Sequence, residues 1–290
     1  MMNNPMSPSE NLRDAISHLN ALPAIPKIAQ EILSLKLISE EGERALLKLI
    51  EHDPLLSAKV IGLSNASLFG AAKKIMTVRD AVTVLGIKRV KMIALSFAMM
   101  SSMTRELTGL LNVHNLWQHS LTVAMAMHTL SSAMPSDIRP LEDEIFLAGL
   151  LHDIGFLVLN HINPKLSNKF HARLAAEVER PVEAIEAEML EMGHSELGAE
   201  LGRYWNLPED IVAVLRYHHQ PNNPRAAFGQ PLVRMVNMAE KLLPTFGIFE
   251  HTPPDISNEE WLALGIDPSK ADEIKELLQK HNEEVLATFN

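Results

Sequence analysis

The chain has 290 residues, of which 47% are hydrophobic and 21% are charged, a composition typical of a globular protein with one large or two modest domains. A formal charge of −10 argues against general binding to nucleic acid or to an anionic membrane. The absence of cysteine excludes disulfides, thiolate zinc sites and cysteine nucleophiles. Any metal must therefore be held by histidine and carboxylate side chains.

The N-terminal residues 1–14 have neither the basic start nor the apolar core of a secretion signal. The strongly apolar stretches, such as residues 92–100, are too short to span a bilayer. We therefore expect a cytoplasmic protein that makes no contact with a membrane.

Apolar residues recur at helical spacing along nearly the whole chain, for example through residues 28–37 and 211–217. Alternating patterns typical of strands are nearly absent. Helix starts are indicated at Ser9, Pro54 and Pro208, and helix ends at Gly70, Gly86, Gly109, Gly193 and Pro221. The sequence predicts an all-α fold of at least a dozen short helices joined by brief loops.

The distribution of histidine changes near residue 110. Eleven of the thirteen histidines follow this point, whereas lysine-bearing helices precede it. We therefore expect an N-terminal helical lobe over residues 1–110 and a His-rich lobe over residues 111–250.

The segment 251–270 is rich in proline, aspartate and serine, and it separates the body of the protein from a last amphipathic helix at residues 271–288. We expect this linker and helix, residues 251–290, to form a C-terminal unit that docks on the body. The predicted contact face consists of Ile274, Leu277, Leu278, Val285 and Leu286.

The candidate chemistry lies in a series of histidines and carboxylates, each placed in or at the end of a different predicted helix. The series consists of His119, the pair His152 and Asp153, His194, the pair His218 and His219, and Glu240. Neutral imidazoles with a carboxylate suit iron, manganese, nickel or zinc, and a carboxylate between two imidazole groups can bridge two ions. Two such ions can activate water and hold a phosphoryl oxygen. The sequence thus predicts a site for one or two divalent transition metals.

Each histidine alone has a simpler interpretation, because a single histidine on a helix is more often a hydrogen-bonded core or surface residue than a ligand. The adjacent pair His152 and Asp153 is more specific. Neighbouring helical side chains point about 100° apart, so both can reach one metal only near a helix end or from a buried position. The alternative for Asp153 is a hydrogen bond at a helix N-terminus or between helices.

Two other features suggest weaker hypotheses. Lys88 and Arg89 belong to a local basic cluster that either binds a phosphate or acidic partner or forms a solvated helix face. Met-rich stretches at residues 99–103 and 125–127 are typical of core filling, although methionine also suits adaptable partner surfaces.

Residues 12–250 resemble the HDOD domain, the HD-related output domain of bacterial signalling proteins, which is akin to the HD and HD-GYP metal-dependent phosphohydrolases. The resemblance rests on several passages that occur in the order of the family: LPAIPKIAQEIL, IEHDPLLSAKVIGLSNASLFG, TVRDAVTVLGIKRVKMI, LWQHS, EIFLAGLLHDIGFLVL and HSELGAELGRYWNLPEDIVAVLRYHHQP. It covers about four fifths of the chain and implies an HD-like helical bundle with an N-terminal helical lobe.

The resemblance also implies roles for the site residues. In related HD phosphohydrolases the first metal is held at positions that match His119, His152 and Asp153, and a second at those of His194, His218 and His219. A late aspartate that closes the first site matches Glu240 here, which is one methylene longer. Active HD-GYP enzymes carry a phosphate-contacting lysine where this chain has Phe156, and PNNP replaces the GYP segment.

These departures lead to three hypotheses. The first is a non-catalytic module of bacterial signal transduction that binds a protein partner and keeps a residual or structural metal site. The second is a metal-dependent phosphohydrolase acting on a nucleotide or other phosphoester, with Asp153 bridging two ions as its catalytic residue. The third is a sensor that binds a nucleotide without cleaving it, in which Lys88 and Arg89 contribute to binding.

Overall fold

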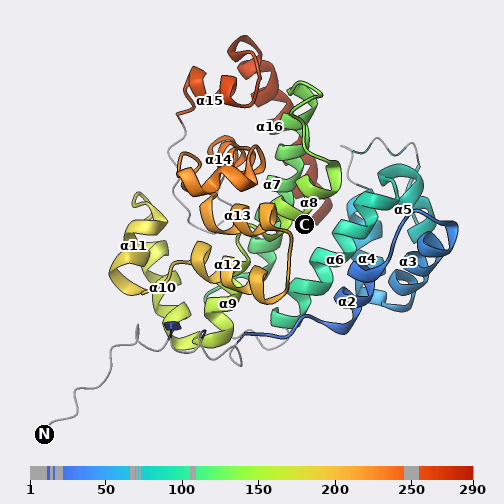
Figure 1. Ribbon diagram of the computed structural model, residues 1–290, viewed down its shortest axis with the longest axis horizontal. Helices are drawn as coiled ribbons and strands as arrows, with labels where there is room; N and C mark the ends of the chain where they lie inside the picture. The colour runs from blue at the N-terminus through green and yellow to red at the C-terminus, as the bar shows by residue number, and fades with distance from the viewer. Residues whose placement is uncertain are drawn as a thin grey trace, which may run out of the picture.

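The computed structural model describes residues 12, 13, 16, 22–65, 69, 71, 73–104, 109–244 and 255–289, and side chains within these ranges except at 102, 104 and 284–289. Within these ranges the chain forms fifteen α-helices and two short 3₁₀-helices, and it contains no strand (Figure 1). The predicted all-α fold is therefore confirmed.

In the described part of the chain that precedes the His-rich lobe, the helices with assigned bounds are α2 (Lys27–Ser34), α3 (Glu40–His52), α4 (Pro54–Ser64), α5 (Val78–Leu85) and α6 (Ile87–Thr104). Capping explains several of these boundaries. The side chain of Asp53 accepts hydrogen bonds from the amides of Leu55 and Leu56, and Pro54 occupies the first turn of α4. Gly86 ends α5 with φ of 82°, a left-handed conformation that favours glycine.

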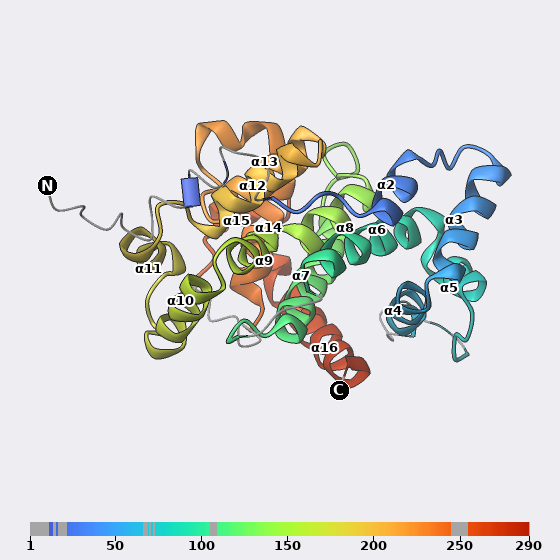
Figure 2. The ribbon, with the colours of Figure 1, turned by 90° about the horizontal axis from the view of Figure 1, so that it is seen from below.

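The helix α6 is the central element of this part of the molecule. It contacts α2, α3, α4 and α5 on one side and α8 and α9 on the other. Figure 2 accordingly shows α6 between α7 and the group α3–α5. Its buried side chains include Met99, Met100 and Met103, as expected for core filling. Because α6 packs on both groups of helices, the two lobes share a continuous core, and the predicted boundary near residue 110 stays a prediction.

The His-rich lobe is built on the helix pair α7 (Val113–Ala133) and α8 (Glu142–Leu151). Around this pair lie α9 (Ile154–Ile162), α10 (Pro164–Ala176), α11 (Val182–Met189), α12 (His194–Tyr204), α13 (Glu209–Tyr217), η2 (Pro224–Gly229) and α14 (Leu232–Leu242). Fourteen residues of α7 are buried. A helix that is apolar on all sides belongs in the middle of a core, which is where α7 and α8 lie.

The expectation that no segment is long and apolar enough to cross a membrane was wrong. Residues Glu142–Ile162, which form α8 and α9, reach this length with a mean hydropathy of 1.7. However, 89% of the eighteen-residue apolar segment within this stretch is buried inside the molecule, where α8 and α9 pack against α6, α7 and α12. Its apolar character is therefore accounted for by the protein core.

Several predicted helix ends also need correction. Gly193 does not end a helix, because α11 ends at Met189 and Gly193 is the residue that precedes α12. Gly109 and Pro221 lie a few residues beyond the ends of α6 and α13. The predicted start at Ser9 and the predicted end at Gly70 fall outside the described residues.

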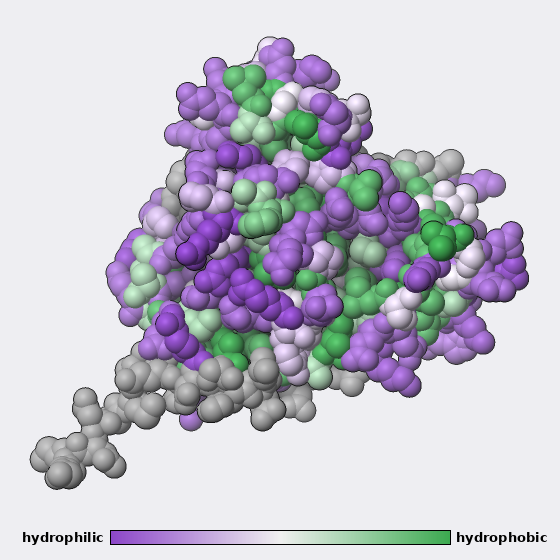
Figure 3. All heavy atoms as spheres, viewed as in Figure 1, coloured by the Kyte–Doolittle hydropathy of each residue, from purple (hydrophilic) through white to green (hydrophobic). Residues whose placement is uncertain are grey.

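The C-terminal part consists of α15 (Asn258–Ala263), η3 (Pro268–Lys270) and α16 (Ala271–Phe289), and α16 lies against α7. Ile274 and Leu278 of the predicted apolar face are buried, but Leu277 is 42% exposed because it lies on the outer side of the helix. The side chains of Val285 and Leu286 are outside the described residues. Hydrophilic residues cover most of the face seen in Figure 3, with hydrophobic residues scattered between them.

Candidate metal centre

The seven predicted ligands come together in the interior of the His-rich lobe. They are His119 on α7, His152 and Asp153 at the junction of α8 and α9, His194 at the start of α12, His218 and His219 after α13, and Glu240 on α14. Six of them are buried residues, and the side chain of the seventh, His219, is 6% exposed. The structure thus brings together residues that are spread over more than a hundred positions of the sequence.

The break between α8 and α9 explains how two adjacent residues reach the same place. The helix α8 ends at Leu151, His152 follows as its C-cap residue, and Asp153 precedes the first residue of α9. The Asp153 side chain makes no capping hydrogen bond to α9. Its carboxylate faces imidazole nitrogens, so the alternative of a hydrogen bond to a helix N-terminus does not apply.

One group of ligand atoms surrounds the first candidate metal position. The Nε2 atoms of His119 and His152 lie 3.1 Å apart, and each lies 3.2 Å from Oδ2 of Asp153. Oε1 of Glu240 lies 3.5 Å from Nε2 of His152. Two imidazoles and two carboxylates therefore face one point, as the resemblance implied.

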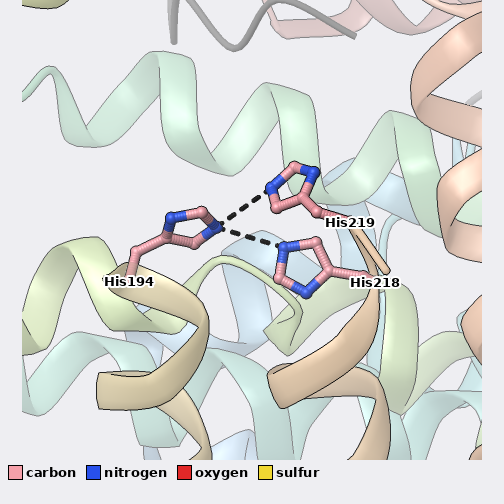
Figure 4. A group of neighbouring side chains, drawn as sticks. All are labelled: His194, His218 and His219. Atoms are coloured by element: carbon pink, nitrogen blue, oxygen red, sulfur yellow. Dashed lines mark hydrogen bonds between the residues drawn. The ribbon is translucent and has the colours of Figure 1, made fainter. Parts of the chain in front are cut away.

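The second group consists of three imidazoles, which Figure 4 shows converging from two segments of the chain. Nε2 of His194 lies 3.1 Å from Nε2 of His218 and 3.2 Å from Nε2 of His219. Oδ1 of Asp153 completes the group, at 3.7 Å from His194 and 3.6 Å from His218. Asp153 thus presents one oxygen to each group, the arrangement of a bridging carboxylate.

The backbone fixes the orientation of two of these rings. Nδ1 of His152 lies 2.8 Å from the carbonyl oxygen of Gly149, and Nδ1 of His218 lies 3.0 Å from that of Val214. A carbonyl oxygen only accepts hydrogen bonds, so each Nδ1 carries the proton. Nε2 then presents its lone pair to the centre, which is the form that binds a metal.

Glu186 on α11 orients the third ring, and the sequence analysis did not identify it. Its buried Oε1 lies 2.7 Å from the amide nitrogen of His194 and 2.8 Å from its Nδ1. Gly193 permits this approach, because a Cβ there would lie 2.4 Å from Oε2 of Glu186. No sequence motif distinguishes Glu186 from the other acidic residues of α11. Its role depends on the loop after α11, which brings His194, eight residues later in the sequence, back to the Glu186 side chain.

The charge states of the centre suit metal binding. Burial lowers the pKa of His218 well below its usual value, and the neighbouring His219 and His194 lower it further. Burial alone would raise the pKa of Asp153, but His152 and His119 hold it well below its usual value. Near neutral pH, the imidazole of His218 is therefore neutral and the carboxylate of Asp153 is ionised, as metal ligands must be.

The donor set fits divalent transition metals. Ligand atoms at about 2.0–2.2 Å from one ion stand roughly 3–3.5 Å from one another, close to the separations within each group. Neighbouring imidazole nitrogens that all present lone pairs repel one another unless a cation lies between them. Nitrogen and carboxylate donors favour iron, manganese, nickel or zinc over calcium or magnesium.

The family follows from a comparison with known proteins. A model of the HDOD domain matches residues 22–221, which make up most of the chain and include six of the seven candidate ligands. The seventh, Glu240 on α14, lies beyond the matched range. The chain belongs to the HDOD family. The predicted HD-like bundle is therefore confirmed as well.

Solved structures share this fold. An HDOD domain protein from Geobacter sulfurreducens is 25% identical, with a TM-score of 0.68, over 93% of this chain and 96% of that chain. A signal-transduction candidate from Marinobacter aquaeolei VT8 is also 25% identical, with a TM-score of 0.74, over 96% of this chain and 60% of that chain. A candidate phosphohydrolase from Shewanella amazonensis SB2B, at 22% identity and a TM-score of 0.70, shares the fold.

A curated relative extends beyond the matched region. An uncharacterised protein of Treponema pallidum (strain Nichols) is 25% identical over 249 residues, which are 82% of this chain and 46% of that protein. The HDOD chain thus spans about half the length of the curated relative it matches.

The basic cluster near α6 lies apart from the metal centre. Arg89 donates a hydrogen bond of 2.5 Å to Glu142 on α8, and its guanidinium lies over the rings of Phe69 and Phe146. Lys88 is exposed. The structure gives Arg89 a role in joining α6 to α8, and ligand binding by Lys88 and Arg89 stays a prediction.

Proposed function

We propose that this HDOD protein is a regulatory module of bacterial signal transduction, in which bound divalent metal stabilises the His-rich lobe and no substrate is turned over. The Marinobacter structure named for signal transduction, at 25% identity, supports this assignment. A protein partner then receives the signal. We place this module in the cytoplasm, in accordance with the buried state of its most apolar helices.

The observation that carries this proposal is the environment of Phe156. Its side chain is fully buried and stacks on the imidazole of His194, with 4.4 Å between the ring centres and 20° between the ring planes. Active HD-GYP enzymes, as the resemblance implies, hold a phosphate-contacting lysine at this position. An apolar ring packed on a candidate ligand cannot bind a phosphate, so the chain lacks this substrate contact beside the second metal position.

The residues of the centre would then act structurally. His119, His152, Asp153 and Glu240 would hold one ion, and His194, His218 and His219 would hold a second, with Asp153 shared between them. Divalent ions bound there would neutralise two buried carboxylates. The side chains would in turn tie together α7, the α8–α9 junction, α12, α14 and the end of α13, because each element contributes at least one ligand.

A second candidate function is that of a metal-dependent phosphohydrolase acting on a nucleotide or other phosphoester. The completeness of the two donor groups favours it, since Asp153 presents Oδ2 to one group and Oδ1 to the other. Two divalent ions would supply Lewis-acid activation of the phosphoester. Asp153 would then be the catalytic residue because it joins both groups.

Metal content and turnover together test the two functions. We would measure bound metal by plasma emission spectroscopy, and hydrolysis of a phosphoester panel, for the wild type and for the double variant His152→Ala/Asp153→Ala. His161→Ala is the matched control, because His161 is exposed at the end of α9. Our proposal expects one or two equivalents of metal that the double variant loses, and no hydrolysis.

The outcomes separate the alternatives. Hydrolysis that the wild type and His161→Ala perform, and that the double variant lacks, would establish the phosphohydrolase and overturn the non-catalytic function. Absence of metal from the wild type would leave the histidines with a packing role alone.

A further inference from the structure

A cavity between the N-terminal helices and α7 lies outside the metal centre. It has a volume of about 260 Å³ and is lined by Leu55, Leu56 and Lys59 of α4, Phe97 and Ser101 of α6, and Val113, His114 and Trp117 of α7. A narrow inner end, at which Gln118 and Leu121 also lie, shares Lys59, Phe97, His114 and Trp117 with it. We name this space the α4–α7 cavity.

Its walls are mainly apolar and aromatic. The rings of Phe97 and Trp117 stack with 4.0 Å between their centres and 23° between their planes. Phe97 is buried, whereas Trp117 is only partly covered and lines the cavity. Such a wall favours a flat apolar ligand, because aromatic rings stack on one another in offset geometry.

Two polar side chains of the cavity form no side-chain hydrogen bond or ion pair with a residue that the structure describes. Gln118 is 8% exposed and lines the inner end, yet its side-chain amide makes no hydrogen bond with a described residue. Lys59 is half-buried, forms no ion pair with a described carboxylate, and has its Nζ 5.6 Å from the centre of the Phe97 ring. The amide of Gln118 and the ammonium of Lys59 are therefore available to bind a polar ligand that enters the cavity.

We propose that the α4–α7 cavity binds a nucleoside monophosphate. The base stacks against Trp117, its hydrogen-bonding edge meets the amide of Gln118, and the phosphate pairs with Lys59. A glutamine amide offers one donor and one acceptor group, which match the hydrogen-bonding edge of a base. Any of the four bases can stack on an aromatic side chain, because every base has a flat π-face. No carboxylate is found among the described residues that line the cavity, although the protein as a whole carries a charge of −10.

The cavity lies between the N-terminal helices and α7, so a ligand bound there could regulate how these helices pack. Its walls come from α4 and α6 of the N-terminal part and from α7, and Trp117 is two residues from His119 on the same helix. An occupied cavity would therefore fix the packing of α7 against the N-terminal helices beside the metal centre. This proposal does not depend on metal binding or on turnover.

The test is isothermal titration calorimetry of AMP, GMP, CMP and UMP into the full chain treated with chelator. We expect saturable binding of at least one of the four. Adenosine and inorganic phosphate, each titrated alone, should bind at least about tenfold more weakly than the nucleotide. Adenosine lacks the phosphate that pairs with Lys59, and inorganic phosphate lacks the base that stacks on Trp117.

Variants assign the site. Lys59→Gln should weaken nucleotide binding about tenfold and leave nucleoside binding unchanged, and Gln118→Leu should weaken both about tenfold. Lys73→Gln, at an exposed lysine away from the cavity, is the matched control. Circular dichroism melting of each variant verifies that it is folded.

Three results would overturn the proposal. The first is the absence of saturable binding by any of the four nucleotides at millimolar concentration. The second is binding that Lys59→Gln and Gln118→Leu leave unchanged. The third is binding that Asp153→Ala removes while Lys59→Gln retains it, because the nucleotide would then occupy the metal centre. None of these results depends on whether the purified wild-type protein contains metal, because the titrated protein is treated with chelator.

Discussion

Glu186 shows how a residue outside the candidate ligand set determines the state of a ligand. Its Oε1 accepts from both the backbone amide and Nδ1 of His194, so the ring is held with its Nε2 lone pair toward His218 and His219. The rings of His152 and His218 obtain the same orientation from backbone carbonyls, which no substitution can remove. His194 is therefore the ring whose orientation mutagenesis can test.

We predict that Glu186→Leu changes the tautomer of His194 and weakens metal binding at the second position about 10- to 100-fold, because the acceptor that fixes Nδ1–H is lost. Long-range ¹H–¹⁵N NMR of the metal-free protein reports the tautomer, and metal titration reports the affinity. Glu183→Gln is the control, since Glu183 lies on the same helix and makes no described contact with His194. An unchanged tautomer in Glu186→Leu would contradict the positioning role.

The buried imidazole of His218 predicts a pH dependence of stability. Its folded pKa lies well below the usual 6.5, so the unfolded chain binds more protons in the acidic range. The contribution of His218 is fully present above pH 6.5 and is lost as the pH falls below that value toward the folded pKa. We expect the free energy of unfolding of the metal-free protein, measured in urea, to fall between pH 7.5 and pH 5.5. The variant His218→Gln should show a smaller fall, and an equal fall would rule out this residue as the cause.

At the scale of elements, the close approach of α9 and α12 sets the geometry of the centre. Gly155 lies so near α12 that a Cβ would come within 1.8 Å of the carbonyl oxygen of His194. Asp153 and His194 reach each other across this contact. The glycine two positions after Asp153 is therefore a requirement of helix packing at the site.

We predict that Gly155→Ala lowers the free energy of unfolding by about 1–3 kcal/mol and reduces metal binding, because α9 and α12 must separate. Gly62→Ala is the contrasting control. Gly62 lies within α4 with no atom within 4 Å of an added Cβ, so this variant should gain about 1 kcal/mol. Urea unfolding measures both, and destabilisation of equal size in both variants would contradict the packing argument.

At the scale of the whole molecule, the metal centre joins helices that span residues 113–242. If ions bind the folded state alone, metal at about 100 times its Kd stabilises that state by about 2.7 kcal/mol. We therefore predict that chelation lowers the melting temperature by about 5–10 °C, as measured by differential scanning calorimetry. The variant Asp153→Asn should melt at the same temperature with and without chelator. A wild-type melting temperature that is the same with and without chelator would argue against a stabilising metal.

The all-α fold and the family could be predicted from the sequence alone, and the sequence also indicated the candidate ligands. Helical periodicity is a local property, and the ligand types and their order along the chain are visible without coordinates. The location of several helix ends was less predictable, since Gly193 precedes α12 where the pattern predicted an end. The apolar stretch of α8 and α9 likewise could be assigned to the core only from the structure, in which 89% of its eighteen-residue apolar segment is buried.

The residues that orient the candidate ligands and pack beside them could be identified only from the folded structure. Glu186 and Phe156 act through contacts between α11, α9 and the start of α12, and the α4–α7 cavity is formed by three helices from distant parts of the chain. The reason is physical: a side chain's hydrogen-bond partner, its burial and the space around it depend on how helices pack. Residues far apart in sequence set these properties, and no local pattern records them.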